Sequence, residues 1–196
     1  FPAYLSSVQT HLDVSEDLLP RALTLFAAMD FVRALLFSNS PAFFGLSGFE
    51  ETVCFRDYLW ENSGFKRLAN NVGKVEGTFR EPEDVVQMIL SRSMFYRQRA
   101  GQLQLIEPVS VQQYFDGEDS TEEDMKTYLS FQNVEVTRRG TLEVRSDCAQ
   151  PVADAFCPPA FHLGVLSALE EAEELLYGFL RRNLPEDLLC SPSRNR

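Results

Sequence analysis

Two short segments alternate apolar and polar side chains, and this period of two constrains the fold more than any other feature. Residues 4–14 alternate over part of their length, with Ser7, Gln9, His11 and Asp13 on the polar side. In residues 141–145 the polar positions are Thr141, Glu143 and Arg145. Successive side chains of a strand point to opposite faces, so both segments are predicted to be strands with one polar face. Such a face either meets solvent, as in many antiparallel sheets, or forms a binding surface.

Apolar residues recur at helical spacing in two longer segments. Residues 15–37 carry one apolar stripe, and Ser15 followed by Glu16 and Asp17 is typical of a helix start. Residues 160–180 carry a second stripe opposite a row of glutamates. We therefore expect two long helices, each with one apolar face.

The rest of the chain supplies shorter elements. Helices are expected at 81–91 and 110–114, and a hairpin at 94–99 and 103–106 around Ala100-Gly101. Strands are expected at 133–137 and 141–145, and the acidic segment 116–124 is expected to begin a solvated helix that runs through 125–129. Long connections are expected at 42–80, a length often associated with function, and at 147–159. The predicted class is α+β, with one domain over 1–190 and a frayed tail at 191–196.

The excess of acidic residues argues against two classes of binding partner. The chain has 29 acidic and 18 basic residues and a net charge of −11. This charge argues against a nucleic-acid binder and against docking on an anionic membrane. The sequence also lacks an apolar run of ~18 residues, so no membrane-spanning helix is expected. The chain begins without an initiator Met or a signal peptide, and we expect it to be processed or to be a piece of a longer protein.

The cysteines indicate a reducing compartment. Cys54, Cys148, Cys157 and Cys190 form no Cys-x-x-Cys pair, and the chain has only two histidines, which argues against structural zinc. Hydrophobic residues make up 44% of the chain and can form a core without disulfides. Four reduced thiols in a cytoplasmic protein are therefore expected, and cysteine nucleophile chemistry is disfavoured.

Several segments, in the same order, resemble those of the glutamate–cysteine ligases, especially the plant and actinobacterial type of the carboxylate–amine ligase superfamily. Residues 139–145 resemble that family's Gly-x-Leu-Glu-x-Arg strand, and residues 7–13 resemble its Val-Gln-x-Asn/His-Leu-Asp strand. Three more segments are similar to its Leu-Phe-x-Asn-Ser-Pro helix end, its Arg-x-x-x-Trp segment and its Tyr-rich strand: residues 36–41, 55–60 and 94–97. These segments cover nearly the whole chain.

The resemblance implies a fold and an activity. The fold is a curved antiparallel sheet like that of glutamine synthetase, with helices on one face. The activity is ATP-dependent joining of the γ-carboxylate of glutamate to the amine of cysteine, through γ-glutamyl phosphate, in cytoplasmic glutathione biosynthesis. The implied cofactors are ATP and Mg²⁺, and the implied substrates are glutamate and cysteine or another amine.

The resemblance also assigns roles to six residues. Carboxylate and side-chain oxygens hold Mg²⁺, and arginines present planar donor forks to phosphate, the two needs of phosphoryl transfer. The implied metal ligands are Glu143 and Gln9. The implied catalytic arginines, near the transferred phosphate or the substrate glutamate, are Arg145 and Arg56. The implied contacts to substrate or phosphate are Arg139 and His11.

One departure from the family pattern concerns length. Family members are about twice as long or more and carry an acidic Glu-x-Glu strand in their N-terminal part, whereas only eight residues precede Gln9. We therefore expect the C-terminal portion of a ligase, inactive alone, with an incomplete sheet whose exposed edge makes two chains associate or part of the chain lose order. Two alternatives stay open: a ligase of the same superfamily with another amine acceptor, and a non-catalytic interaction module that retains the fold.

Overall fold

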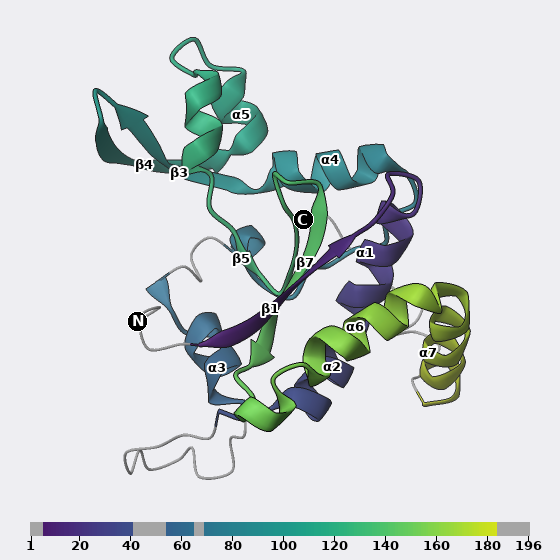
Figure 1. Cartoon of the computed structure of the whole chain (residues 1–196). Coiled ribbons are helices and arrows are strands. Elements are labelled where there is room, and N and C mark those ends of the chain that lie inside the picture. Colours follow the sequence, from purple (N-terminus) through teal and green to yellow (C-terminus); the bar gives the residue numbers. More distant parts are fainter. Residues whose placement is uncertain (1–5, 41–53, 65–68, 184–196) are drawn as a thin grey trace.

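A three-stranded antiparallel sheet organises the part of the chain that the computed structural model describes, residues 6–40, 54–64 and 69–183 (Figure 1). Its strand order is β1 (Ser7–Asp13), β7 (Thr141–Cys148) and β6 (Val134–Val136). The three predicted strands are confirmed. The strand β7 extends to Cys148, so the loop predicted from residue 147 begins later than expected.

The pairing of β1 with β7 contains an irregularity. Thr10 lies opposite Val144 and Val8 lies opposite Asp147, so Gln9 alone faces both Arg145 and Ser146. An extra residue on one strand of a pair is a β-bulge, and it changes which way the following side chains point. Strict alternation would put Asp147 on the face of Glu143. In the structure, Asp147 instead bonds to a histidine on the helix-covered face.

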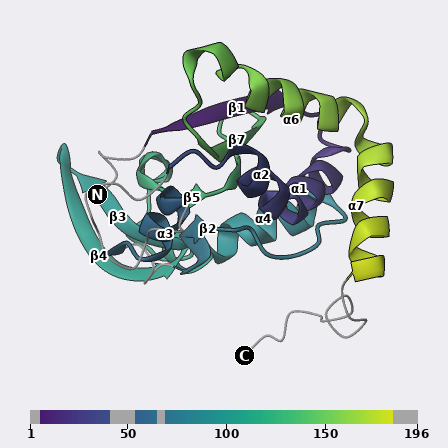
Figure 2. The same cartoon turned by 90° about the horizontal axis from the view of Figure 1, so that it is seen from below.

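Helices cover one face of the sheet and enclose the core. The helices α1 (Leu19–Ala28) and α2 (Asp30–Phe37) contact β7, and α6 (Cys157–Ser167) contacts β1. Figure 2 shows α1 and α2 beneath β1 and β7. The main apolar side chains of this core are Leu12, Leu23, Leu25, Phe26, Val134, Leu142 and Val144. Burial of each large side chain stabilises the fold by about 1.5–3 kcal/mol.

Both long helices predicted from the sequence are broken, which corrects that prediction. The first begins at Leu19, next to Pro20, rather than after Ser15, and it is interrupted at Met29. A proline is favoured in the first turn, where its missing N–H costs nothing. The second divides at Ala168, where α6 and its 3-10 lead-in (Val152–Ser167) meet α7 (Leu169–Asn183) at 96°. The bend returns Leu169 and Leu176 to the core.

A hairpin and the short helix after it form a second region, whereas the short helix before it packs on α1 and adds Val85 to the main core (Figures 1 and 2). The predicted hairpin is confirmed as β3 (Ser93–Arg99) and β4 (Gln102–Ser110), and the predicted helices are confirmed as α4 (Pro82–Ser91) and α5 (Val111–Phe115). Each helix starts with a capping box, so that paired side chains satisfy the free N–H groups of its first turn.

The remaining described elements are short. The helix α3 (Phe55–Glu61) and the strand β2 (Val72–Gly73) lie within the predicted connection. The strand β2 pairs in parallel with β5 (Phe131–Gln132). The helix expected after the acidic segment is a 3-10 helix, Glu122–Thr127, which corrects its type. Residues 42–53 and 65–68 of the predicted connection, and the predicted tail, lie outside the described residues. The α+β class with antiparallel sheets is confirmed.

Within the described ranges, no individual helix combines the length and apolar character needed to cross a membrane. The bent pair Val152–Ser167 and Leu169–Asn183 meets that test only when its two parts are taken together.

Candidate functional site

A row of ionisable side chains crosses the sheet on the face opposite α1. The register puts His11 on β1 and Glu135 on β6 directly across from Glu143 on β7. Directly opposite residues of antiparallel strands share one face of the sheet. The row and its neighbours along the strands are called the polar face below: Gln9, His11, Glu135, Glu143 and Arg145.

Glu143 is the centre of the polar face. Its Oε2 accepts a hydrogen bond from Nη2 of Arg145 at 2.6 Å, and its Oε1 lies 3.7 Å from Nε2 of His11. The side chain of Glu143 is 7% exposed and that of His11 is 40% exposed. The structure thus brings three predicted site residues together, with a shielded carboxylate beneath an accessible imidazole.

The geometry of this centre is fixed by second contacts. Nδ1 of His11 lies 3.0 Å from Oγ1 of Thr141, which orients the ring. Nη1 of Arg145 donates to the carbonyl oxygen of Ser130 at 2.5 Å. Because its guanidinium is held at two points, Arg145 presents a fixed donor fork.

Sequence reasoning missed two members of this region, Glu135 and Arg92. Arg92 is 1% exposed, forms an ion pair with Oε1 of Glu135, and donates from Nη1 to the hydroxyl of Tyr128 at 2.9 Å. Burial raises the pKa of Tyr128, although Arg92 acts in the opposite direction. The hairpin turn contained a signal for Glu135, since counting outward from residues 138–140 pairs 135 with 143. Nothing in the sequence around Arg92 indicated its role.

Arg56 occupies a different position from the one its predicted role suggests. It lies on α3, and its guanidinium donates to the backbone carbonyl oxygens of Arg145 at 3.3 Å and Ser146 at 3.4 Å. Burial lowers the pKa of Arg56, while Asp57, 3.2 Å away, acts against this shift. Arg56 therefore anchors α3 to the backbone of β7, and its assignment as a catalytic arginine stays a prediction.

A second buried arginine shares this anchor. Nη1 of Arg33 donates to the carbonyl oxygen of Ser146 at 2.5 Å. Burial alone would lower the pKa of Arg33, but the carboxylates of Asp30 and Asp57 outweigh burial and raise it. The end of β7 is therefore held by two cations whose charges are compensated locally.

The other two predicted residues lie at the margins of the sheet. Gln9 is exposed and faces the bulge in β7. Arg139 is exposed in the turn between β6 and β7, where its backbone N–H donates to Oγ1 of Thr137 at 3.3 Å. Neither position tests the role that the resemblance assigns.

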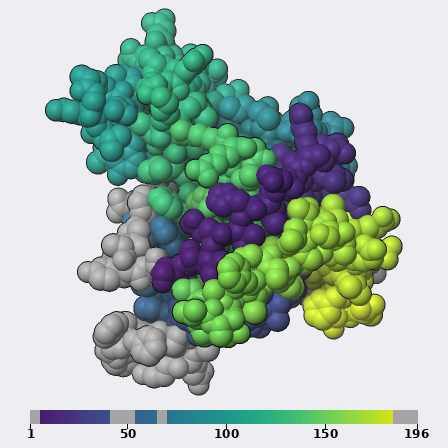
Figure 3. All heavy atoms as spheres, viewed as in Figure 1, coloured from purple at the N-terminus to yellow at the C-terminus, as the bar shows by residue number. Residues whose placement is uncertain are grey.

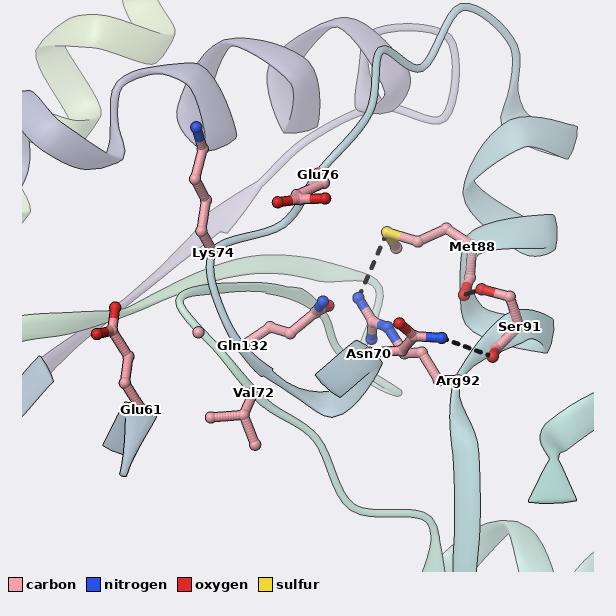
Figure 4. A pocket seen from close by; sticks show the side chains of 10 residues that line it. Glu61, Asn70, Val72, Lys74, Glu76, Met88, Ser91, Arg92 and Gln132 are labelled. Atoms are coloured by element: carbon pink, nitrogen blue, oxygen red, sulfur yellow. Dashed lines mark hydrogen bonds between the residues drawn. The ribbon is translucent and has the colours of Figure 1, made fainter. Parts of the chain in front are cut away.

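A cavity of about 340 Å³ opens beside Arg92. Figure 4 shows Lys74 and Glu76 entering it from the segment after β2, opposite Met88 and Ser91 of α4. Gln132 of β5 also lines it, and its buried Oε1 finds no hydrogen-bond partner among the described residues. Arg92 contributes to this cavity and also holds Glu135, so the cavity adjoins the polar face through one side chain.

The described residues do not form a magnesium site on their own. Magnesium prefers several oxygen ligands in octahedral geometry. Both oxygens of Glu143 face cationic or imidazole groups, and Oε1 of Glu135 is paired with Arg92, which leaves its buried Oε2 without a partner in the described part of the chain. Across residues 6–40, 54–64 and 69–183, no three His, Cys, Asp or Glu side chains are placed to hold a metal. The assignment of Glu143 and Gln9 as ligands stays a prediction.

A further ionisable pair lies on the helix-covered face. Nε2 of His162 lies 2.7 Å from Oδ2 of Asp147, and both side chains are almost fully buried. The His162 ring also contacts Phe26, Phe37 and Phe161. Sequence reasoning did not single out this pair, because the bulge that turns Asp147 inward is not visible in the alternation.

Comparison with models of known protein families gave no match, and a search among curated proteins gave none either.

Proposed function

We propose that this chain is part of an ATP-dependent ligase that joins the γ-carboxylate of glutamate to the amine of cysteine through γ-glutamyl phosphate. One observation carries the proposal: His11, Glu143 and Arg145 meet on one face of the sheet. These residues occupy the segments that resemble the two characteristic strands of the family. In this proposal β1, β7 and β6 belong to a larger curved sheet like that of glutamine synthetase.

The chemistry of phosphoryl transfer suits the side chains of the polar face. Such transfer depends mostly on positioning and on neutralising charge at the phosphoryl oxygens. Arg145 is 20% exposed, and Glu143 and Ser130 fix its guanidinium, so its remaining surface can meet an anionic oxygen without reorganisation. His11 is more exposed and can contact the substrate carboxylate or phosphate as a hydrogen-bond donor.

The charges of the polar face favour a ligand that carries both signs. The carboxylates of Glu143 and Glu135 are balanced by the guanidinium groups of Arg145 and Arg92. A balanced face attracts neither a free phosphate nor a free cation strongly, but it can accommodate a nucleotide that arrives with its metal. The ligands for that metal have to include oxygens beyond this face, which agrees with the expectation that the chain is the C-terminal portion of a longer enzyme.

The test uses the natural protein that carries this chain, incubated with ATP, Mg²⁺, glutamate and cysteine. We expect release of ADP that depends on both amino acids, and γ-glutamylcysteine detected by mass spectrometry. Glu143→Gln keeps the shape of the side chain but removes its charge, and we expect kcat to fall about 100-fold or more because Arg145 loses its ionic partner. Glu171→Gln, at an exposed position on α7, serves as the matched control and should leave the rate unchanged.

The outcomes separate the proposal from its alternatives. Turnover stimulated only by another amine, in a panel of amino acids, would assign a different acceptor within the same superfamily. Full activity in Glu143→Gln would exclude a role for the polar face in the reaction. If the unmodified protein releases no ADP with any amino acid although circular dichroism shows that it is folded, the result would favour the non-catalytic interaction module.

A further inference from the structure

Two thiols lie in contact at the end of the sheet, away from the centre of the polar face. Cys54 comes directly before α3, Cys148 is the last residue of β7, and their Sγ atoms are 3.8 Å apart. Oγ of Ser40 lies 3.2 Å from Sγ of Cys148, and the backbone N–H of Phe55 donates to the carbonyl oxygen of Ser40 at 2.8 Å. Since a disulfide bond is about 2.05 Å long, side-chain rotation with a small backbone shift can close this gap.

We infer that Cys54 and Cys148 are an oxidisable dithiol site that closes to an intramolecular disulfide and joins the start of α3 to the end of β7. The inference does not depend on the proposed ligase activity. It differs from the expectation of four independent reduced thiols, because the fold places two of them within contact although 94 residues separate them in the chain.

The surroundings of the pair prepare it for oxidation. The hydrogen bond from Cys54 lowers the pKa of Cys148 to about 6, and the backbone N–H of Asn39 and the hydroxyl of Ser40 act in the same direction. The same contact with Cys148 raises the pKa of Cys54. The carboxylate of Asp57 also faces both thiols and opposes their ionisation. At neutral pH the two sulfurs therefore share one proton.

The two cysteines differ in their exposure to solvent and in the reactivity of their thiols. Cys54 is partly exposed, whereas Cys148 is 1% exposed. Cys148 has the lowered pKa and is thus the nucleophile, because the thiolate is the reactive form of cysteine. A small oxidant reaches it past the partly exposed Cys54, whose thiol resolves the oxidised sulfur.

A peroxide completes the chemistry. The Cys148 thiolate attacks hydrogen peroxide, so that an S–O bond forms, the O–O bond breaks and hydroxide leaves. The Cys54 thiol then attacks the sulfenic sulfur of Cys148, forming the S–S bond and releasing the hydroxyl group with the thiol proton as water. The two sulfurs together give up two electrons, and the peroxide accepts them.

The disulfide would act on the anchor that positions the end of β7. The helix α3 carries Arg56, which holds the backbone carbonyl oxygens of Arg145 and Ser146 by hydrogen bonds. Oxidation would add a covalent link between the same two elements. Among the described residues, the reduced form joins these elements through the hydrogen bonds of Arg56 and through Arg33, which pairs with Asp57 of α3 and donates to the carbonyl oxygen of Ser146.

The experiment treats the folded protein with hydrogen peroxide in a Cys157→Ser/Cys190→Ser background, which leaves only this pair. Cys54 lies in the tryptic peptide 34–56 and Cys148 in the peptide 146–181, so a linked pair is identified by mass spectrometry without reduction. We expect the linked peptides to form at least about tenfold faster in the folded protein than in protein unfolded in urea, because folding places the sulfurs in contact.

The controls make each outcome decisive. Cys54→Ser and Cys148→Ser in the same background should yield no linked peptide within one chain, and dithiothreitol should restore both thiols of the pair. Linkage between two chains, equal rates in folded and unfolded protein, or persistence of both free thiols would overturn the inference. The readout is covalent mass, so it stays valid if the protein proves to have no ligase activity.

Discussion

Asp147 and His162 are almost fully buried, and each supplies the polar contact that the other has lost to burial. Their side chains meet at 2.7 Å, and the Oδ1 and Nδ1 atoms on their far sides find no hydrogen-bond partner among the described residues. The aromatic rings around His162 exclude water from the contact. A buried polar group that loses its only partner keeps the full cost of its desolvation.

Substitutions of the two partners should therefore lower the free energy of unfolding by different amounts. His162→Leu leaves a carboxylate alone in the interior and should lower the free energy of unfolding by about 3–5 kcal/mol. Asp147→Asn keeps a hydrogen-bonding group and should cost only about 1–3 kcal/mol. Urea unfolding, followed by the fluorescence of the single tryptophan, measures both. Asp154→Asn, at an exposed position, should change stability by less than about 0.5 kcal/mol. Equal small losses in both core variants would show that the pair is not shielded from water.

Local sequence patterns predicted the strands and tight turns but not the breaks in the helices. The alternation in residues 7–14 and 141–145 gave β1 and β7, and Ala100-Gly101 gave the hairpin. The breaks at Met29 and Ala168 interrupt continuous apolar stripes, because long-range packing sets the direction of each half. The bulge opposite Gln9 likewise depends on the pairing of two strands far apart in the chain. Local periodicity contains neither kind of information.

The same distinction applies to the candidate site: local patterns predict some of its residues, and the others depend on long-range packing. Glu143, Arg145 and His11 could be predicted, because each lies on a strand with a clear polar face and within a segment that resembles a family motif. Arg92 and the Cys54–Cys148 contact could not, because they depend on which elements meet across the sheet. Arg56 was found by resemblance, but its contacts to the backbone of β7 follow from the placement of α3.

The turn between β6 and β7 offers a test of how strongly one glycine sets the register of the polar face. Gly140 has φ +79°, and an added Cβ would meet no other atom within 4 Å, so any cost of substitution comes from the backbone. Gly140→Ala should lower the free energy of unfolding by about 1–2 kcal/mol. Ala100 also has positive φ, at 50°, so Ala100→Gly relieves comparable strain and should not destabilise the protein. Denaturant titration checks both variants, and a neutral Gly140→Ala would mean that the turn relaxes.

The molecule exposes two kinds of surface that a folded chain usually covers. Among the described strands, β1 and β6 are the edges of the sheet and each pairs with β7 alone, and β1 runs across the visible surface in Figure 3. Phe31, Leu175 and Phe179, on α2 and α7, are also exposed and line an apolar cavity of about 380 Å³. An unpaired strand and an apolar patch both favour association, whereas the net charge of −11 opposes it by repulsion between copies.

These opposing forces predict that association of two chains depends on salt. Raising the ionic strength from about 0.05 to about 0.5 M shortens the screening length from more than 10 Å to less than 5 Å, so repulsion weakens while edge pairing and apolar contact persist. Sedimentation equilibrium should therefore show a dimer fraction that rises with salt. Ser7→Lys places a charge on the β1 edge and should reduce this fraction, whereas Ser167→Lys makes the same charge change at an exposed position at the end of α6 and should not. If the protein stays monomeric at both salt concentrations, its open edges are protected by the twist and bulge of β1 and β7, and the expectation of pairing is wrong. If both lysine variants raise the dimer fraction equally, net charge rather than the strand edge controls association, because each added lysine lowers the negative charge that keeps the copies apart.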